Sequence, residues 1–280
     1  MKVLVTGATG RVGSRLVPRL LRNGHEVRIL VRSRERGEAL AALGAEPVVG
    51  DLLEPDSLKP AVRGVEAVVH LAAFFRGASE EEAHAVNASG TSSLAAAALE
   101  SDVPRFVYTS TNLVYGPGQG RTFTEADPPN PDSAYPASKA ASESELLKLH
   151  QSHGLGVRIL RLAFVYGDGD PHLREGLVWF RNWNPAQRFQ MVHHADVAQA
   201  VLLALNADDR NGEIYNVADD EPVAAGEILR LMNEPVADDA DKRPVDLAWV
   251  QLVDTSKIKE QLGFRPIYPT LRSAVLGNAL

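Results

Sequence analysis

The chain of 280 residues carries a net charge of -7 and contains no cysteine. The negative balance argues against nucleic acid and anionic membranes as partners, because both attract a basic face. The lack of cysteine excludes disulfides, thiol nucleophiles and cysteine metal sites. No apolar run reaches the roughly 20 residues of a membrane span, and Met1 leads straight into a predicted strand, so we expect a soluble, cytoplasmic protein.

Residues 2–13 combine a short apolar strand, a glycine-rich turn and the start of a helix. Three glycines are spaced three apart. Gly7 can turn the chain sharply, Gly10 leaves room for a diphosphate, and Gly13 lets the helix lie close to the strand. The helix N-terminus adds N–H groups and a partial positive charge. This stretch predicts a dinucleotide site formed by Gly7, Thr9, Gly10, Arg11, Val12 and Gly13.

Apolar strands alternate with helical patterns along most of the chain. After the first strand, further strands are expected at 26–31, 46–49, 66–71, 105–109, 157–162 and 213–217. Helices are expected at about 80–100, 134–150 and 197–205. This alternation indicates parallel βαβ units, and therefore an α/β fold with a doubly wound, Rossmann-type parallel sheet of about seven strands.

The pattern changes after Tyr166. Residues 167–190 look loop-like, and residues 219–280 give short helices separated by prolines. We expect a dinucleotide-binding domain of residues 1–166 and 191–218. A small substrate-binding lobe of residues 167–190 and 219–280 would cover the strand ends, where open α/β sheets bind ligands. Trp179, Phe180 and Trp183 are expected in the lobe core rather than at the substrate.

The end of the second predicted strand indicates which dinucleotide is bound. An acidic residue about 20 positions past the glycine turn holds a ribose 2′-hydroxyl, whereas an arginine there accommodates a 2′-phosphate. Arg32 occupies that position, and Arg11 lies in the turn itself. NADP(H) is therefore favoured, with NAD(H) as the alternative. A solvated surface charge is the other interpretation of Arg32, and the preferred one for Arg34 and Arg36.

Two more strand ends are expected to border the cofactor. Asp51, followed by Leu52, can accept a hydrogen bond from the adenine amino group or cap the next helix. The fourth strand ends in small residues past which a cofactor can run, namely Leu71, Ala72 and Ala73.

Tyr135 and Lys139 are four residues apart on a predicted helix and therefore share one face. A tyrosine with a pKa of about 10 is a poor base near neutrality, and a nearby ammonium is expected to lower that pKa. Ser110 and Thr111 follow the fifth strand, where a hydroxyl can stabilise charge developing on a substrate oxygen. The set predicts proton exchange with a carbonyl or an alcohol.

The order of these motifs resembles the extended short-chain dehydrogenase/reductases, the group that includes NAD-dependent epimerases and dehydratases. The resemblance implies Tyr135 as general acid/base and Lys139 as pKa modifier and nicotinamide-ribose ligand. It implies Thr111 rather than Ser110 as the donor to the substrate oxygen. Asn87 would be a supporting polar group beside the cofactor, or alternatively a helix-start cap. Relatives commonly dimerise through the two long helices at 80–100 and 134–150, so a homodimer is expected.

Departures from the family pattern narrow the expected substrate. Family dehydratases follow the threonine with Asp-Glu, but Asn112 and a leucine follow here, so dehydration is not expected. Nucleotide-sugar epimerases usually have an asparagine where this chain has Phe164, and an arginine where it has Phe189. Arg243 resembles a second diphosphate-binding arginine of the family. The candidate substrate residues are Thr111, Asn112, Phe164 and Arg243.

The leading hypothesis is a reductase, or an alcohol dehydrogenase in reverse, that moves hydride between NADPH and a ketone or secondary alcohol. One alternative is a nucleotide-sugar epimerase with a transient keto intermediate. The other is an NADP-sensing protein without turnover, which would not need Thr111, Tyr135 and Lys139. No metal is expected, because the adjacent His193 and His194 face different ways and are better suited to positioning the helix of Asp196.

Overall fold

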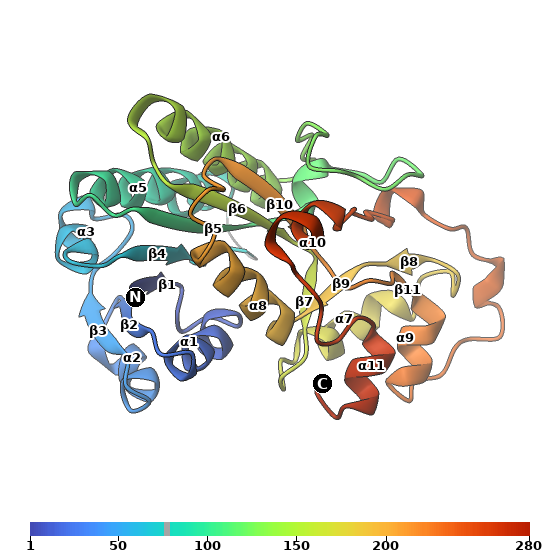
Figure 1. Ribbon diagram of the computed structural model, residues 1–280. Helices are drawn as coiled ribbons and strands as arrows, with labels where there is room; N and C mark the ends of the chain where they lie inside the picture. Colours follow the sequence, from blue (N-terminus) through green and yellow to red (C-terminus); the bar gives the residue numbers. More distant parts are fainter. Residues whose placement is uncertain (76–78) are drawn as a thin grey trace.

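The computed structural model describes residues 1–75 and 79–280. At its centre is a seven-stranded sheet in the order β10-β6-β5-β4-β1-β2-β3 (Figure 1). Every neighbouring pair in this sheet is parallel. The strands are β1 (Lys2–Thr6), β2 (Glu26–Val31), β3 (Glu46–Val49), β4 (Ala67–His70), β5 (Arg105–Thr111), β6 (Val157–Leu162) and β10 (Glu213–Val217). The predicted seven-stranded, Rossmann-type α/β fold is confirmed.

Helices cover both faces of the sheet (Figure 1). One face carries α1 (Gly13–Arg22), α2 (Arg34–Ala41) and α8 (His194–Leu205), and the other carries α3 (Pro55–Val62), α5 (Gly90–Glu100) and α6 (Ala134–His153). Successive strand residues point to opposite faces, so Val3 and Val5 join one buried cluster and Leu4 joins the other. Burial on both faces explains why these strands read as continuous apolar runs.

The strand order reverses next to β1. The chain runs from β1 to β2 and β3 on one side, and then crosses to β4 and β5 on the other. Ligands bind at such a switch point, outside the carboxyl ends of the strands. The glycine turn after β1 lies at this point.

A smaller unit adjoins the carboxyl ends of the strands. It contains α7 (His172–Phe180), α9 (Ala225–Leu231), α11 (Leu271–Leu276) and the strand pair β8 (Arg188–Phe189) with β11 (Val223–Ala224). A second strand pair, β7 (Phe164–Tyr166) with β9 (Met191–His193), joins it to the sheet unit, because its residues pack in the cores of both. Tyr166 and Phe180 belong to its separate apolar cluster. The expectation that residues 167–190 are loop-like is wrong for α7, because Leu173, Leu177 and Phe180 bury one helical face.

We propose the predicted division of the chain into a sheet unit and a lobe on the strength of this third cluster. One element of the predicted lobe also serves the sheet unit. Helix α10 (Ser256–Leu262) packs against β10, and its Ile258 joins a core cluster of the sheet. Short 3-10 turns complete the chain: η2 (Asn112–Tyr115), η3 (Ala240–Lys242) and η4 (Leu247–Trp249).

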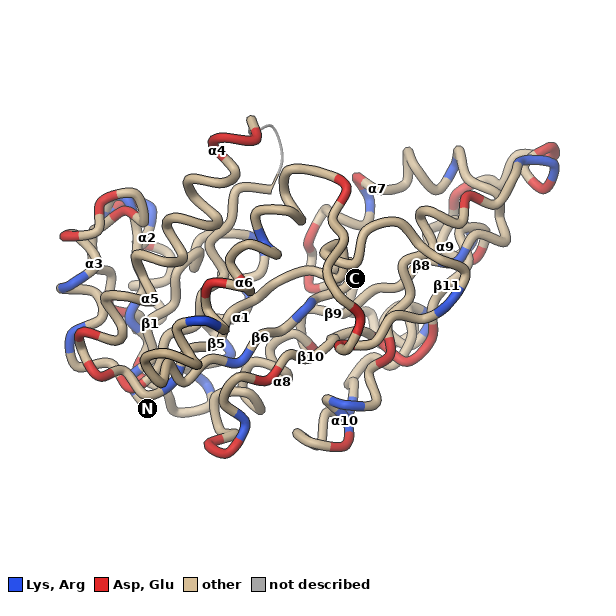
Figure 2. The backbone as a smooth tube through the Cα atoms, turned by 90° about the horizontal axis from the view of Figure 1, so that it is seen from above, with Lys and Arg blue, Asp and Glu red and all other residues tan. Residues whose placement is uncertain are grey.

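The helix predicted over 80–100 is divided into three parts. They are α4 (Glu80–His84), the π-helical turn η1 (Ala85–Ser89) and α5. Figure 2 shows the acidic start of α4 at the outer edge of the molecule. Ser79 and Glu82 form a reciprocal capping box there, which explains why the helix begins at Glu80. None of the helices in the described residues is long and apolar enough to pass through a membrane.

The two adjacent histidines position α8, as the sequence predicts. His193 Nδ1 accepts from the N–H of Ala195 at 3.0 Å and so caps the helix, while its Nε2 contacts the carbonyl oxygen of Ala279 at 2.7 Å. His194 Nε2 lies 2.8 Å from Asp170 Oδ2. Asp196, in the first turn, accepts from the N–H groups of Ile267 and Tyr268 and so fastens the C-terminal segment.

Candidate active site

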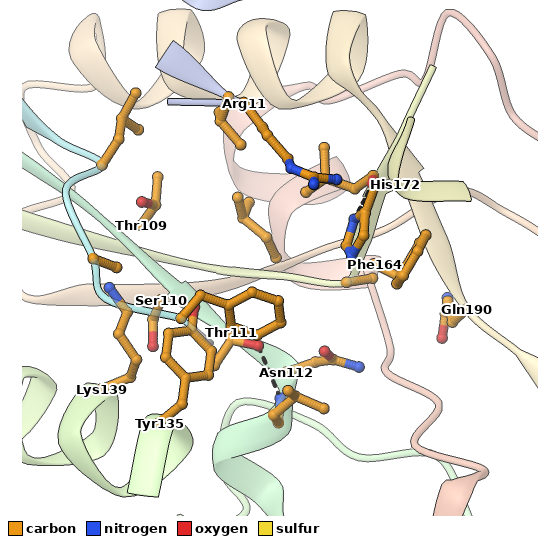
Figure 3. Close-up of a pocket in the computed structure, with 18 of the residues that line it drawn as sticks. Arg11, Thr109, Ser110, Thr111, Asn112, Tyr135, Lys139, Phe164, His172 and Gln190 are labelled. Carbon is orange, nitrogen blue, oxygen red and sulfur yellow. Dashed lines mark hydrogen bonds between the residues drawn. The ribbon is translucent and has the colours of Figure 1, made fainter. Parts of the chain in front are cut away.

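A cavity of about 720 Å³ lies between the carboxyl ends of the strands and the lobe. Figure 3 shows Ser110, Thr111, Tyr135 and Lys139 around one part of it and Arg11, Phe164 and His172 around another. The cavity therefore joins the glycine turn to the predicted proton-transfer groups. The predicted site residues that line it are Gly7, Gly10, Arg11, Val12, Gly13, Leu71, Ala73, Thr111, Asn112, Tyr135, Lys139 and Phe164.

The glycine turn has the geometry that a diphosphate requires. Gly7 has φ +68°, and a Cβ on it would lie 2.5 Å from the backbone nitrogen of Ala72. A Cβ on Gly13 would collide with the carbonyl oxygen of Gly7. A Cβ on Gly10 would meet only that same oxygen, at 3.2 Å, so its other side is open. No side chain caps the start of α1 within the described residues, which leaves its N–H groups available to a phosphate.

Tyr135 and Lys139 project from the first turns of α6 (Figure 3). The side chain of Lys139 is 2% exposed, and its Nζ lies 4.1 Å from the ring centroid of Tyr108. Burial lowers the pKa of Lys139 to about 7, although Glu143 acts in the opposite direction. The phenol of Tyr135 packs edge-on against Phe75, with ring centroids 4.7 Å apart.

The expectation that Lys139 lowers the pKa of Tyr135 is not met in this structure. Burial raises the pKa of Tyr135 above its ordinary value, because a phenolate in this apolar setting loses hydration. The lowered pKa of Lys139 makes its ammonium easier to deprotonate, and the Nζ of Lys139 lies against the ring of Tyr108. Tyr135 is therefore held as the neutral phenol, the form that can donate a proton.

Two hydroxyls from the end of β5 face the cavity. The Oγ1 of Thr111 accepts from the N–H of Leu113 at 3.2 Å, which caps η2 and leaves its hydrogen free to donate. The Oγ of Ser110 is buried and has no hydrogen-bond partner among the described residues. Both residues line the cavity. The choice of Thr111 over Ser110 as substrate-oxygen donor stays a prediction.

Asn87 lies within η1, where it caps no helix start. Its Oδ1 accepts from the N–H of Phe74 at 2.7 Å. Its Nδ2 donates to the carbonyl oxygen of Phe74 at 3.0 Å and to Ser138 Oγ at 2.9 Å. Ser138 Oγ in turn donates to the carbonyl oxygen of Tyr135. Asn87 is therefore a positioning residue that fixes the segment after β4 against the start of α6.

Arg11 connects the glycine turn to the lobe. Its guanidinium lies 3.2 Å from Asp170 Oδ1 and 2.9 Å from Glu175 Oε1. Asp170 also accepts from the backbone N–H of His172 at 3.0 Å and pairs with His194. The position of the lobe over the turn is thus fixed by a buried carboxylate with three partners.

Several predicted cofactor residues lie outside the cavity. Arg32 is exposed just after β2. The Oδ1 of Asp51 accepts from the N–H of Leu53 at 3.0 Å and does not cap α3, whose N-cap is Glu54. The complete set of predicted cofactor residues beyond the cavity lining is Thr9, Arg32, Asp51, Leu52, Ala72 and Asn87.

Arg243 does not line the cavity, and its contact with the substrate stays a prediction. Its Nη1 donates to the carbonyl oxygen of Arg181 at 2.6 Å, and its Nη2 lies 3.4 Å from Asp239. The guanidinium therefore ties the end of α7 to η3. By contrast, Phe164 and Phe189 face the cavity, as the departures from the family pattern led us to expect.

All three tryptophans of the chain line the cavity, so the expected place in the lobe core holds for Phe180 but is incomplete for Trp179 and Trp183. Trp179, in the last turn of α7, and Trp183, just past its end, are four residues apart and both reach the cavity, whereas Phe180 turns into the lobe core. The i, i+4 spacing was the available signal. Trp249 and His172 gave none, because only the tertiary fold brings their segments to the strand ends.

Comparisons with known proteins agree on the kind of protein that this site belongs to. Residues 3–218 match the model of the NAD dependent epimerase/dehydratase family. A 4-hydroxy-2-methyl-3-oxo-4-farnesyl-3,4-dihydroquinoline-1-oxide ketoreductase from Stigmatella aurantiaca is 30% identical, with 100% of this chain and 80% of the relative covered. Sterol demethylase protein B from Methylococcus capsulatus is 34% identical, with 84% and 74% covered.

A solved structure is similar over the whole length of the chain. It is the dTDP-glucose 4,6-dehydratase from Streptomyces venezuelae, with NAD and TYD bound. The TM-score is 0.82 at 28% sequence identity, and the alignment covers 100% of this chain and 95% of the other.

Proposed function

The chain belongs to the NAD dependent epimerase/dehydratase family, and on that premise we propose that it is a carbonyl reductase or alcohol dehydrogenase. It would transfer hydride between a nicotinamide and a ketone or secondary alcohol. One observation carries the proposal: a single cavity joins the glycine turn to Thr111, Tyr135 and Lys139. A ketoreductase related over the full chain supports the same reaction class.

The chain's residues fit a nicotinamide dinucleotide. Gly10 leaves room for its diphosphate, Gly7 allows the tight turn beneath it, and Lys139 would hold the nicotinamide ribose. When bound, this group supplies or accepts the hydride. The similar dehydratase structure contains NAD, which supports the cofactor class.

The proton is handled by the chain itself. In the reductive direction Tyr135 donates its phenolic proton to the carbonyl oxygen as that oxygen becomes an alkoxide. The raised pKa of Tyr135 keeps this proton in place until it is needed. Thr111 donates a second hydrogen bond to the same oxygen, which stabilises the developing charge. In the oxidative direction the phenolate form of Tyr135 would take the single alcohol proton, while Thr111 keeps its hydrogen bond to the same oxygen.

We place the adenosine half beyond the cavity, along the ends of β2 and β3. Arg32 would contact a ribose 2′-phosphate, and the carboxylate of Asp51 would accept from the adenine amino group. The exposure of Arg32 directly after β2 supports NADP(H) as the preferred cofactor.

We also propose a homodimer formed through the faces of α5 and α6, and light scattering of the purified protein should give twice the monomer mass.

The alternative, a nucleotide-sugar epimerase, differs in what happens to the cofactor. A reductase consumes NADPH in proportion to ketone, whereas an epimerase retains its dinucleotide and interconverts sugars without net consumption. We expect loss of NADPH absorbance with a panel of ketones, and none with UDP-glucose. Turnover of UDP-glucose with tightly retained, unconsumed dinucleotide would contradict the proposal.

A further inference from the structure

Rings form a continuous series along the cavity from the phenol of Tyr135 to Trp249. The ring of Phe75 lies 4.7 Å from Tyr135 and 6.3 Å from His172. His172 stacks on Phe164 at 3.9 Å, and Phe164 lies 5.2 Å from Phe189. Trp183 lies 5.6 Å from Phe189 and 5.9 Å from Trp249. We name this series the aromatic arc; it consists of Phe75, His172, Phe164, Phe189, Trp183 and Trp249.

All six rings of the aromatic arc line the cavity, and the two at its ends are also exposed. Phe75 is 45% exposed and Trp249 is 53% exposed, and the neighbouring Trp179 is 38% exposed. Large rings at a concave site are a feature of pockets that bind apolar ligands. Each ring that a ligand covers contributes apolar burial and ring contacts, so the arc favours an occupant with apolar surface along its length.

The lobe side of the cavity offers no described lysine or arginine to a diphosphate. Asp170, the one carboxylate among the described lining residues, is already paired with Arg11 and His194. Arg11 lines the cavity, but its guanidinium bonds Asp170 and Glu175. A diphosphate taken out of water needs cationic partners, and the described lobe residues do not supply them.

The two glutamines that line the lobe side of the cavity, Gln190 and Gln251, already form hydrogen bonds with the protein backbone. Gln190 Oε1 accepts from the N–H of Val253 at 2.8 Å, and its Nε2 donates to the carbonyl oxygen of Asp219. Gln251 Nε2 donates to the carbonyl oxygen of Gly116 at 2.7 Å. The groups that could recognise a sugar hydroxyl are therefore few, and the rings dominate.

We propose that the substrate is an uncharged ketone carried on an extended apolar ring system. Its carbonyl lies at Tyr135 and its ring body lies along the aromatic arc toward Trp249. The position of the carbonyl rests on the proposed function. The apolar, uncharged character of the rest of the substrate rests on the aromatic arc and on the absence of cations among the described lobe residues.

Intrinsic fluorescence tests the inference, because all three tryptophans line the cavity. The probes are trans-1-decalone, an uncharged bicyclic ketone, and UDP-glucose, each titrated with saturating NADP⁺ so that no reduction occurs. We expect saturable fluorescence change with the decalone and none with UDP-glucose. Trp183→Ala should weaken decalone binding about tenfold, as expected for loss of one ring contact.

Leu43→Ala is the matched control, because Leu43 is an exposed apolar side chain that does not line the cavity. Its titration should coincide with that of the original chain. The inference is overturned if UDP-glucose binds more tightly than the decalone, if the decalone gives no saturable change, or if Trp183→Ala and Trp249→Ala bind it as before.

Failure of the proposed function gives a different result. Decalone binding at the arc without NADPH consumption would refute the reductase and leave the apolar occupant standing. Consumption of NADPH with small aliphatic ketones, together with no decalone binding, would refute the apolar ring system and leave the reductase standing.

Discussion

Lys139 has Glu143 one helical turn away, and Glu143 is bonded to the buried Arg161 at 2.6 Å. The sequence spacing places Tyr135 and Lys139 on one helical face, and the structure confirms that both line the cavity. The spacing does not reveal that both groups are desolvated. The effect of burial on their pKa values depends on the strands and the lobe around them, which local spacing does not describe.

The reductive activity should depend on the charge of Lys139. Its pKa of about 7 means that the ammonium is present below that pH and is lost above it, while Tyr135 stays protonated throughout. We predict that kcat/KM for NADPH falls as the pH rises through about 7, because this parameter reports groups of the free enzyme. A pH profile between 5 and 9 measures this.

Replacing the carboxylate of Glu143 tests the assignment. Glu143 raises the pKa of Lys139, so Glu143→Gln should move the fall in kcat/KM to lower pH. Glu145→Gln is the control, because Glu145 lies on the same helix and pairs with Lys148 at 3.8 Å instead. Identical profiles for the two variants would contradict the role of Lys139.

Arg32 should decide between the two cofactors. Arg32→Ala removes the charge proposed to meet the 2′-phosphate, and a lost charge-assisted hydrogen bond of about 1.5–3 kcal/mol corresponds to roughly ten- to hundredfold weaker NADPH binding. NADH binding should be unchanged. Fluorescence titration of both cofactors measures this, with Arg36→Ala as control. Equal losses for NADPH and NADH would refute the assignment.

At the scale of elements, the strands were the most predictable parts of the fold. Their apolar runs are set by burial on both faces, and β2, β3, β6 and β10 have the predicted bounds. The helix at 80–100 looked continuous because its alanines favour helix throughout, and nothing local marks the π-helical turn. That turn is explained by tertiary bonds: Asn87 reaches Phe74 on one side and Ser138 on the other.

Loss of the Asn87 side chain should therefore destabilise the protein. Its amide makes three hydrogen bonds to buried or half-buried groups, each worth about 1 kcal/mol. We predict that Asn87→Ala lowers the free energy of unfolding by about 2–3 kcal/mol in urea titrations. Asn206→Ala, at the exposed end of α8, should lower it by less than about 0.5 kcal/mol. Similar losses for the two variants would show that Asn87 is not a clamp.

At the scale of the whole molecule, the cavity is built from segments far apart in the sequence. The glycine turn, the end of β5, the start of α6 and the lobe meet only through the strand order. The motifs predicted the first three, because each follows a recognisable strand or helix. The lobe wall could not be predicted, since Trp249 and Gln190 reach the cavity from short segments and only the tertiary fold brings His172, at the start of α7, to the strand ends.

The free energy of unfolding should fall at acid pH, because His194, which pairs with Asp170 between the sheet unit and the lobe, is buried. Burial lowers the pKa of His194 to about 4, so between pH 6.5 and 4 the unfolded chain binds a proton there that the folded chain does not. Stability is therefore complete above pH 6.5 and falls as the pH drops toward 4. His70, with its pKa lowered to about 3, acts in the same direction.

We predict a smaller acid loss in His194→Asn than in the original chain. Urea titrations at pH 7, 6, 5 and 4 give the free energy of unfolding at each pH, and the variant should show a flatter dependence. His153→Asn is the control, because His153 is exposed at the end of α6. The same slope in all three proteins would rule out a buried neutral His194.

The decisive test follows hydride from NADPH to the carbonyl carbon and asks whether that transfer depends on Tyr135. NADPH that carries deuterium at the transferred position is mixed with an apolar ketone in a single turnover, and the alcohol is analysed by mass spectrometry. We predict one deuterium on the carbinol carbon, formed at least a hundredfold more slowly in Tyr135→Phe with NADPH affinity unchanged. Transfer at the original rate in Tyr135→Phe, or an alcohol without deuterium, would contradict the account.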